Sequence, residues 1–121
     1  MTEKKEIDVI FFEDNYETAS LLKNLLINKK LTYKEVQSYS EFEIIIQSNK
    51  AKVYVLAVES YISKSITLLQ EQFSHNVDVI IFSNYRKNLK FELPLIHKVE
   101  GLEFLVYGIM DLLKREEIAS S

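Results

Sequence analysis

Short apolar runs alternate with longer amphipathic segments along this chain of 121 residues, and this alternation restricts its fold more than any other feature. Residues 7–12, 53–58 and 79–82 form runs that are almost entirely apolar, and two weaker strands are expected at residues 34–38 and around residues 95–97. A strand exposed on one face alternates apolar with polar side chains, whereas a strand buried on both faces of a parallel sheet does not. The runs therefore predict strands of a buried parallel sheet.

The segments between these runs have the periodicity of amphipathic helices. Apolar side chains recur three or four residues apart, as they do on the buried face of a helix. Ser40 is available to cap the start of the second helix, with Glu43 as its partner three residues later. The four apolar stripes are Thr18, Ala19, Leu22, Leu25 and Leu26; Phe42, Ile45 and Ile46; Ile62, Ile66, Leu69 and Phe73; and Leu102, Leu105, Val106, Ile109 and Leu113.

Strands and helices in such alternation predict a doubly wound α/β fold. Each strand–helix–strand unit makes a right-handed crossover, which produces a five-stranded parallel sheet with helices on both faces. No linker-like composition divides the chain, so we expect one domain over residues 1–121 with a core of about residues 6–115. In such folds the functional crevice lies at the carboxyl ends of the strands. The residues at these ends are Glu13, Asp14, Ala57, Glu59, Ser83 and Lys98.

Charge, cysteine content and hydropathy exclude several classes of function. The formal net charge is −3 and the basic residues are scattered, so the chain lacks the clustered lysines and arginines of a nucleic-acid-binding face. Cysteine is absent, which excludes disulfides, thiolate metal sites and cysteine nucleophiles. No apolar run approaches the length that crosses a bilayer, and the polar N-terminus lacks a signal-like stretch. We expect a cytoplasmic protein that binds neither nucleic acid nor membrane.

Three short motifs follow predicted strands in a recognisable order. Phe12-Glu13-Asp14-Asn15 places an acidic pair after the first strand, Ser83 ends the fourth, and residues 96–103 place Lys98 after the fifth and before a helix. Together these motifs resemble the receiver domain of two-component response regulators, the CheY-like family, over nearly the whole chain. The resemblance implies a flavodoxin-like fold and a role in bacterial signal transduction.

The resemblance also implies a separate role for each residue of the site. In receiver domains the acidic pair holds Mg²⁺ through its oxygens, and the metal and the lysine offset the charge of a phosphoryl group that moves to a central aspartate. The hydroxyl at the end of the fourth strand then hydrogen-bonds a phosphoryl oxygen and so reports its presence. The matching residues here are Glu13 and Asp14, Lys98, and Ser83.

The central aspartate is missing from this chain. Aligning residues 52–56 with the third strand of the family places Ala57 at the phosphoacceptor position, and a methyl group cannot form an acyl phosphate. Glu59 follows two residues later, in the neighbourhood where the family supplies a backbone carbonyl to the metal. A shift of two residues preserves side-chain facing in a strand, so an alignment with Glu59 as the acceptor stays open.

Three further departures affect the rest of the site. Val99 stands where the family has a proline after the lysine, so we expect a trans peptide bond there. Leu95 replaces the aromatic residue that swings with phosphorylation on the fifth strand of the family. Residues 84–90 carry little apolar stripe, and the stretch from Ser83 to Lys98 is short. We therefore expect the fourth helix, between the fourth and fifth strands, to be shortened or lost.

Each remaining polar residue has a structural interpretation beside the functional one. Glu13 and Asp14 form either a weak Mg²⁺ site or an acidic turn that solvates a strand end, and we favour the turn. Lys98 either binds an anion or pairs with Glu13 or Asp14, and we favour the pairing. Ser83 is expected to be structural. We therefore expect no catalytic residue, no enzymatic activity and no cofactor beyond weakly bound Mg²⁺.

Two aromatic residues lie off the apolar stripe of the last helix. Phe104 and Tyr107 are one turn apart, roughly opposite the core-facing residues, and Ile44 is similarly placed on the second helix. Receivers commonly use their last helix for docking. We expect a protein partner or a second copy to bind there and over the region of the shortened fourth helix.

These observations indicate a phosphorylation-independent pseudo-receiver that acts by protein–protein contact. One alternative is a phosphorylatable receiver that uses Glu59 or another acid. The other is a regulatory domain that binds a small anion among Asp14, Ala57, Ser83 and Lys98.

Overall fold

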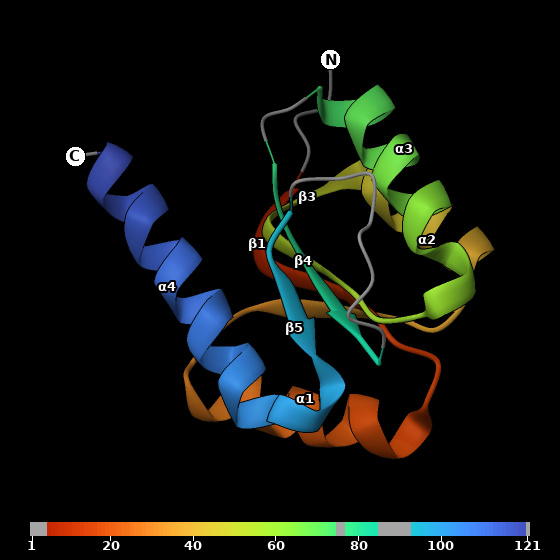
Figure 1. Cartoon of the computed structure of the whole chain (residues 1–121). Coiled ribbons are helices and arrows are strands. Elements are labelled where there is room, and N and C mark those ends of the chain that lie inside the picture. The colour runs from red at the N-terminus through yellow and green to blue at the C-terminus, as the bar shows by residue number, and fades with distance from the viewer. Residues whose placement is uncertain (1–4, 75–76, 85–92, 121) are drawn as a thin grey trace.

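The computed structural model describes residues 5–74, 77–84 and 93–120, without the side chains of residues 116–120, as an α/β protein (Figure 1). The strands are β1 (Lys5–Phe12), β2 (Tyr33–Val36), β3 (Asn49–Leu56), β4 (Asp78–Ser83) and β5 (Leu95–His97). The α-helices are α1 (Tyr16–Asn28), α2 (Tyr39–Ser48), α3 (Ile62–Phe73) and α4 (Leu102–Ser120). Two short 3₁₀ helices, η1 (Glu59–Tyr61) and η2 (Lys98–Glu100), precede α3 and α4.

The sheet is parallel throughout, with strand order β2-β1-β3-β4-β5. Helices α2 and α3 cover one face and α1 and α4 cover the other (Figure 1). Neighbouring residues of β1 point to opposite faces, so that Phe12 packs with the α2–α3 cluster and Phe11 with the α1–α4 cluster. The predicted doubly wound fold, a five-stranded parallel sheet with helices on both faces, is confirmed.

The predicted limits of β1 to β4 were wrong by one to four residues at one or both ends, and β3 and β2 differ most. β3 begins at Asn49, four residues before the predicted start, because the ladder with β1 continues down to the pair of Lys5 and Asn49. Residues 49–52, of which only Ala51 is apolar, therefore belong to the strand although no apolar run marks them. β2 ends at Val36, two residues before the predicted end, because the next helix begins earlier than predicted.

The cap of α2 is Ser38, and the predicted pair of Ser40 and Glu43 was wrong. The Ser38 hydroxyl accepts a hydrogen bond from the backbone N–H of Glu41 at 3.2 Å. The Glu41 carboxylate in turn accepts from the backbone N–H of Gln37 at 3.0 Å. The same serine–glutamate spacing occurs twice in the sequence, and the earlier copy is used because it brings Tyr39 into the first turn, where it packs against the core.

Two glycines have separate roles at α4, Gly101 in the turn before the helix and Gly108 in its contact with the sheet. Gly101 has a φ of 92° between η2 and α4, a conformation that favours glycine. A Cβ atom on Gly108 would lie 3.0 Å from Cδ1 of Ile96 on β5 and 3.6 Å from Cδ1 of Ile80 on β4. A side chain at position 108 would therefore require the Ile96 side chain to shift by a few tenths of an ångström, whereas its contact with Ile80 would be an ordinary one.

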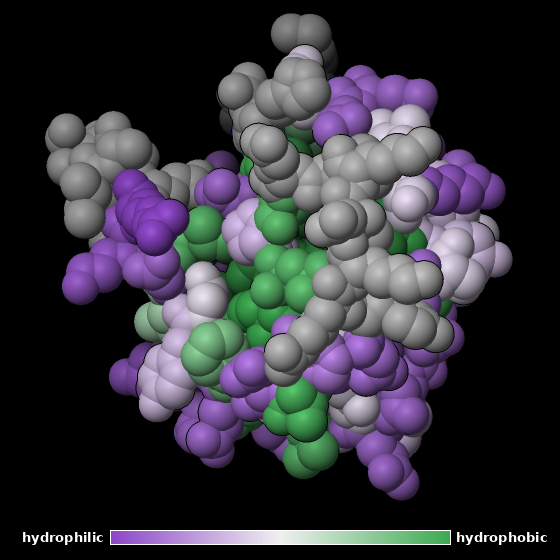
Figure 2. Space-filling view, in the orientation of Figure 1, coloured by the Kyte–Doolittle hydropathy of each residue, from purple (hydrophilic) through white to green (hydrophobic). Residues whose placement is uncertain are grey.

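The expected loss of the helix between β4 and β5 concerns residues 84–90, most of which lie outside the described residues. Asn84, Leu93 and Pro94, which flank that gap, are not helical. Figure 2 shows apolar side chains gathered over β4 and β5, on the face beside α4. Across the described parts of the chain, no helix is both long enough and apolar enough to span a membrane.

Candidate functional site

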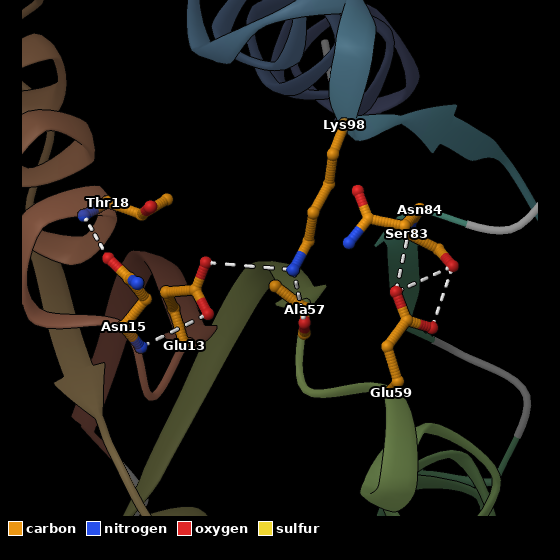
Figure 3. Close-up of polar contacts among 8 residues, drawn as sticks. All are labelled: Glu13, Asn15, Thr18, Ala57, Glu59, Ser83, Asn84 and Lys98. Atoms are coloured by element: carbon orange, nitrogen blue, oxygen red, sulfur yellow. Dashed lines mark hydrogen bonds and ion pairs between the residues drawn. The ribbon is translucent and has the colours of Figure 1, made fainter.

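Parallel strands end at one edge of the sheet, and this edge gathers the predicted site residues (Figure 3). Glu13 follows β1, Ala57 follows β3, and Ser83 is the last residue of β4. Lys98 begins η2 directly after β5, and Glu59 begins η1. Their side chains meet in two groups, one around the Lys98 ammonium and one around the Glu59 carboxylate.

Lys98 reaches from η2 to the ends of β1 and β3. Its Nζ donates a hydrogen bond to the backbone carbonyl of Ala57 at 3.0 Å and lies 4.0 Å from Oε1 of Glu13. The same Nζ lies 5.9 Å from the centroid of the Phe82 ring. The predicted pairing of Lys98 with an acidic residue is confirmed, and the partner is Glu13.

Glu13 is a buried carboxylate, with 3% of its surface exposed. Its Oε2 accepts a hydrogen bond from the backbone N–H of Asn15 at 3.4 Å, a length at which such a bond is weak. Burial raises the pKa of Glu13 above the ordinary glutamate value, and the Lys98 ammonium opposes this rise without cancelling it. The ionised form of Glu13 is therefore held at a cost in the folded protein.

Ala57 lies between Glu13 and Lys98 at the centre of this edge. Its N–H donates to the carbonyl of Phe12 at 2.9 Å, one step beyond the register that pairs Phe12 with Leu56. The residue is 3% exposed, so its methyl group is buried. The ladder between β1 and β3 thus places at this point a side chain that is only a methyl group. The contact between Ala57 and Lys98 is made by the Ala57 backbone carbonyl.

Glu59 turns away from this group and toward the end of β4. The Ser83 hydroxyl lies 2.9 Å from Oε1 and 2.8 Å from Oε2 of Glu59, and it donates to this carboxylate. The backbone N–H of Asn84 donates to Oε1 at 2.8 Å. Asn84 was not singled out in the sequence. Its only signal is its place directly after β4.

The residues present do not fit the Mg²⁺ site that the resemblance implies. Mg²⁺ requires a near-octahedral set of oxygen ligands. Glu13 faces the Lys98 ammonium, Asp14 is exposed, and the carbonyl of Ala57 already accepts a hydrogen bond from Lys98. Across residues 5–74, 77–84 and 93–115, no three acidic, histidine or cysteine side chains form a group that could hold a metal ion.

The remaining predicted features lie on β5, η2 and α4. The peptide bond before Val99 is trans, as expected, and Val99 is exposed. Leu95 is partly buried on β5. Phe104 and Tyr107 are 50% and 67% exposed on α4, so both are accessible on the described surface.

No protein-family model matches the chain, and no curated protein sequence matches it significantly. The fold, in contrast, is similar to that of solved receiver domains. The receiver domain of the Francisella response regulator 1452 matches with a TM-score of 0.79 and 20% identity, covering 91% of this chain and 98% of that one. The receiver domain of the hybrid histidine kinase CckA matches with a TM-score of 0.70 and 18% identity, covering 88% and 98%.

A third similar structure is a response regulator protein from Burkholderia pseudomallei with a phosphorylated aspartic acid, a calcium ion and citrate. It matches with a TM-score of 0.64 and 12% identity, covering 98% of this chain and 76% of that one. Identities this low establish the fold alone. The chain therefore has the fold of a response-regulator receiver domain.

Proposed function

We propose that the protein is a phosphorylation-independent receiver-like module that acts by protein–protein contact in bacterial signal transduction, in the cytoplasm. The observation that carries this proposal is the buried methyl group of Ala57 after β3. In the family that the chain resembles, this position holds the aspartate that accepts the phosphoryl group. An acyl phosphate needs a carboxylate, so this module works without phosphoryl transfer and without catalysis.

The partners of Lys98 and Ser83 support the same conclusion. In receiver domains the lysine and the hydroxyl act on the phosphoryl group. Here Lys98 bonds to the carbonyl of Ala57 and faces Glu13, and the Ser83 hydroxyl donates to Glu59. Both side chains thus contact other residues of this chain. The Glu59 carboxylate accepts the Ser83 hydrogen bond that, in receiver domains, goes to the phosphoryl group.

A phosphorylatable receiver that uses Glu59 is the first alternative. A carboxylate that attacks a phosphodonor needs a free oxygen and a nearby cation that offsets the incoming charge. Both oxygens of Glu59 lie within hydrogen-bond distance of Ser83, and Lys98 is directed to Ala57 and Glu13. These contacts favour a structural role for Glu59.

Incubation with Mg²⁺ and acetyl phosphate, followed by intact mass measurement, tests the proposal. We expect no phosphoryl adduct. The Burkholderia pseudomallei response regulator, which has been seen with a phosphorylated aspartic acid, is the positive control. A stable adduct on this chain would overturn the proposal. Its loss in the Glu59→Gln variant would assign it to Glu59, and its persistence would assign it to another acid.

The second alternative is a domain that binds a small anion among Asp14, Ala57, Ser83 and Lys98. Binding to the folded state raises the melting temperature as the ligand concentration increases. We expect no such rise when inorganic phosphate is titrated at constant ionic strength. A rise that disappears in Lys98→Met would favour the anion-binding alternative.

The exposed pair of Phe104 and Tyr107 on α4 is the candidate contact surface. Aromatic side chains are enriched at the centres of protein interfaces, and these two lie one turn apart beside the apolar area over β4 and β5. Sedimentation velocity over a range of concentrations compares the wild type with a Phe104→Ala/Tyr107→Ala variant. Ile44→Ala is the control, because Ile44 is 67% exposed on the distant helix α2.

Self-association through α4 predicts that only the double variant loses the rise in mass with concentration. A wild type that stays monomeric would exclude a second copy and leave a different protein as the partner. An equal loss of association in the Ile44 control would contradict the choice of α4.

A further inference from the structure

We propose that Glu59 is an internal latch that ties η1 to the end of β4 and thereby holds the neighbouring Tyr61 and Tyr39 rings in place. This inference goes beyond the proposed function. It concerns the conformation of the chain at the start of α2 and α3, and it does not depend on whether phosphate is transferred.

The contact between Glu59 and β4 is short and charge-assisted. The Ser83 hydroxyl lies within 2.9 Å of both carboxylate oxygens, and the Asn84 N–H donates to one of them at 2.8 Å. Hydrogen bonds to an ionised carboxylate are roughly twice as strong as those between neutral groups. Ser83 is itself 2% exposed and fixed in the sheet, so the latch is attached to a rigid element.

The segment that Glu59 begins has no side-chain cap at the start of η1 or of α3. Helices α1 and α2 begin with capping side chains, Asn15 and Ser38. Neither η1 nor α3 has a capping hydrogen bond from the side chain that precedes it, Val58 or Tyr61. An uncapped start leaves backbone N–H groups without a partner and frays more easily. The hydrogen bonds from Ser83 and Asn84 to Glu59 tie this uncapped start to the end of β4.

The position of η1 determines where the Tyr61 ring lies. Tyr61 is the last residue of η1, and its ring stacks on Phe12 at 6.0 Å and on Tyr39 at 5.4 Å between centroids. The ammonium of Lys64 lies 4.4 Å from the centroid of the Tyr39 ring. A groove between α2 and α3 is lined by Tyr39, Lys64 and four other residues of these helices. The latch therefore sets the shape of this surface through Tyr61.

Glu59→Ala is the direct test, read by NMR as hydrogen exchange of the Asn84 amide and as contacts between the Tyr61 and Tyr39 rings. We expect about tenfold faster exchange at Asn84, together with weaker ring contacts. Glu100→Ala is the matched control, because it removes the same charge from the other 3₁₀ helix, where Glu100 is exposed. We expect no change at Asn84 in the control.

A second variant keeps the test decisive if Glu59→Ala unfolds the protein. Ser83→Ala removes the donor from the β4 side and leaves Glu59 in place, and it should weaken the same ring contacts. Unchanged ring contacts in whichever of the two variants folds would overturn the latch. The acetyl phosphate experiment on the wild type has an independent readout, so failure of the latch and failure of the proposed function can be told apart.

Discussion

Two glutamates at the same edge of the sheet differ in the burial and in the hydrogen bonding of their carboxylates. Glu13 is 3% exposed, faces an ammonium at 4.0 Å and accepts one long hydrogen bond of 3.4 Å. Glu59 is only partly buried, yet it accepts short hydrogen bonds from a hydroxyl and from a backbone amide. The more deeply buried carboxylate thus has the weaker hydrogen bonding.

The difference shows how burial and hydrogen bonding compete at a carboxylate. Burial disfavours the charged form, and partners that donate hydrogen bonds or carry positive charge favour it. At Glu13 burial prevails, because the Lys98 ammonium is 4.0 Å away and also bonds to a backbone carbonyl. Glu13 and Lys98 therefore form an ion pair whose carboxylate is held charged at a cost, whereas Glu59 and Ser83 form a short hydrogen-bonded contact.

The largest expected effect comes from Lys98→Met. We expect the free energy of unfolding to fall by about 2 kcal/mol at pH 7, because the variant leaves the Glu13 carboxylate buried without its cation. The figure is below the usual loss for a buried pair because the Lys98 side chain is 23% exposed. Urea unfolding measures the change. The Glu13→Gln/Lys98→Met double variant should recover most of it, and a double variant as unstable as the single one would assign the loss to packing.

The second largest effect is expected from Glu13→Gln, measured as the change in stability with pH. Since the pKa of Glu13 is raised in the folded state, its contribution to stability is complete below the unfolded value of about 4.5 and is lost as the pH rises through the folded pKa. Glutamine is neutral at every pH, so the variant does not lose stability as the pH rises through the folded pKa of Glu13. Thermal unfolding should therefore find equal stability in acid and a more stable variant at pH 7. A less stable variant at pH 7 would show that attraction to Lys98 exceeds the cost of burial.

Ser83→Ala measures the contribution of the contact between Glu59 and Ser83 to stability. We expect a loss of about 1 kcal/mol in the free energy of unfolding, because Glu59 and the end of β4 lose one hydrogen bond. Ser65→Ala is the matched control, because Ser65 is fully buried and its hydroxyl has no hydrogen-bond partner among the described residues. The control should be neutral or stabilising. Equal losses in both variants would mean that the contact between Ser83 and Glu59 adds nothing to stability.

The smallest effect is expected from Asp14→Asn. Asp14 is exposed, so the free energy of unfolding should change by less than about 0.5 kcal/mol. The remaining change should favour the variant at neutral pH, because the charge of Asp14 contributes to the raised pKa of Glu13. Mg²⁺ titration of the wild type and the variant by calorimetry completes the comparison. Heat of binding that Asp14→Asn abolishes would contradict the absence of a metal site.

Much of the fold was predictable because it depends on local patterns. The β5 strand occupies the predicted residues 95–97, and the other strands overlap the predicted runs. The start of β3 was not predictable, because residues 49–52 join the strand only through their ladder with β1. The choice of Ser38 over Ser40 as a cap was also beyond the sequence, since both serines have a glutamate three residues later.

Some contacts of the candidate site were also predictable from the sequence and others were not. The meeting of Lys98 with Glu13 was predictable, because both residues follow parallel strands that end at one edge of the sheet. The meeting of Glu59 with Ser83 was not, because the direction of a side chain beyond a strand end depends on the turn that follows. The role of Phe104 and Tyr107 as a contact surface stays a prediction.

The sequence by itself determined which chemical groups reach the edge of the sheet: a methyl group after β3, carboxylates after β1 and at the start of η1, and a lysine after β5. Side-chain periodicity and strand order are local or nearly local properties, so a linear pattern specifies them. Only the tertiary structure decided how those groups pair. Burial of Glu13, the reach of Lys98 to Ala57 and the turn of Glu59 toward Ser83 depend on distances between residues 24 to 85 positions apart, which packing of the whole chain sets.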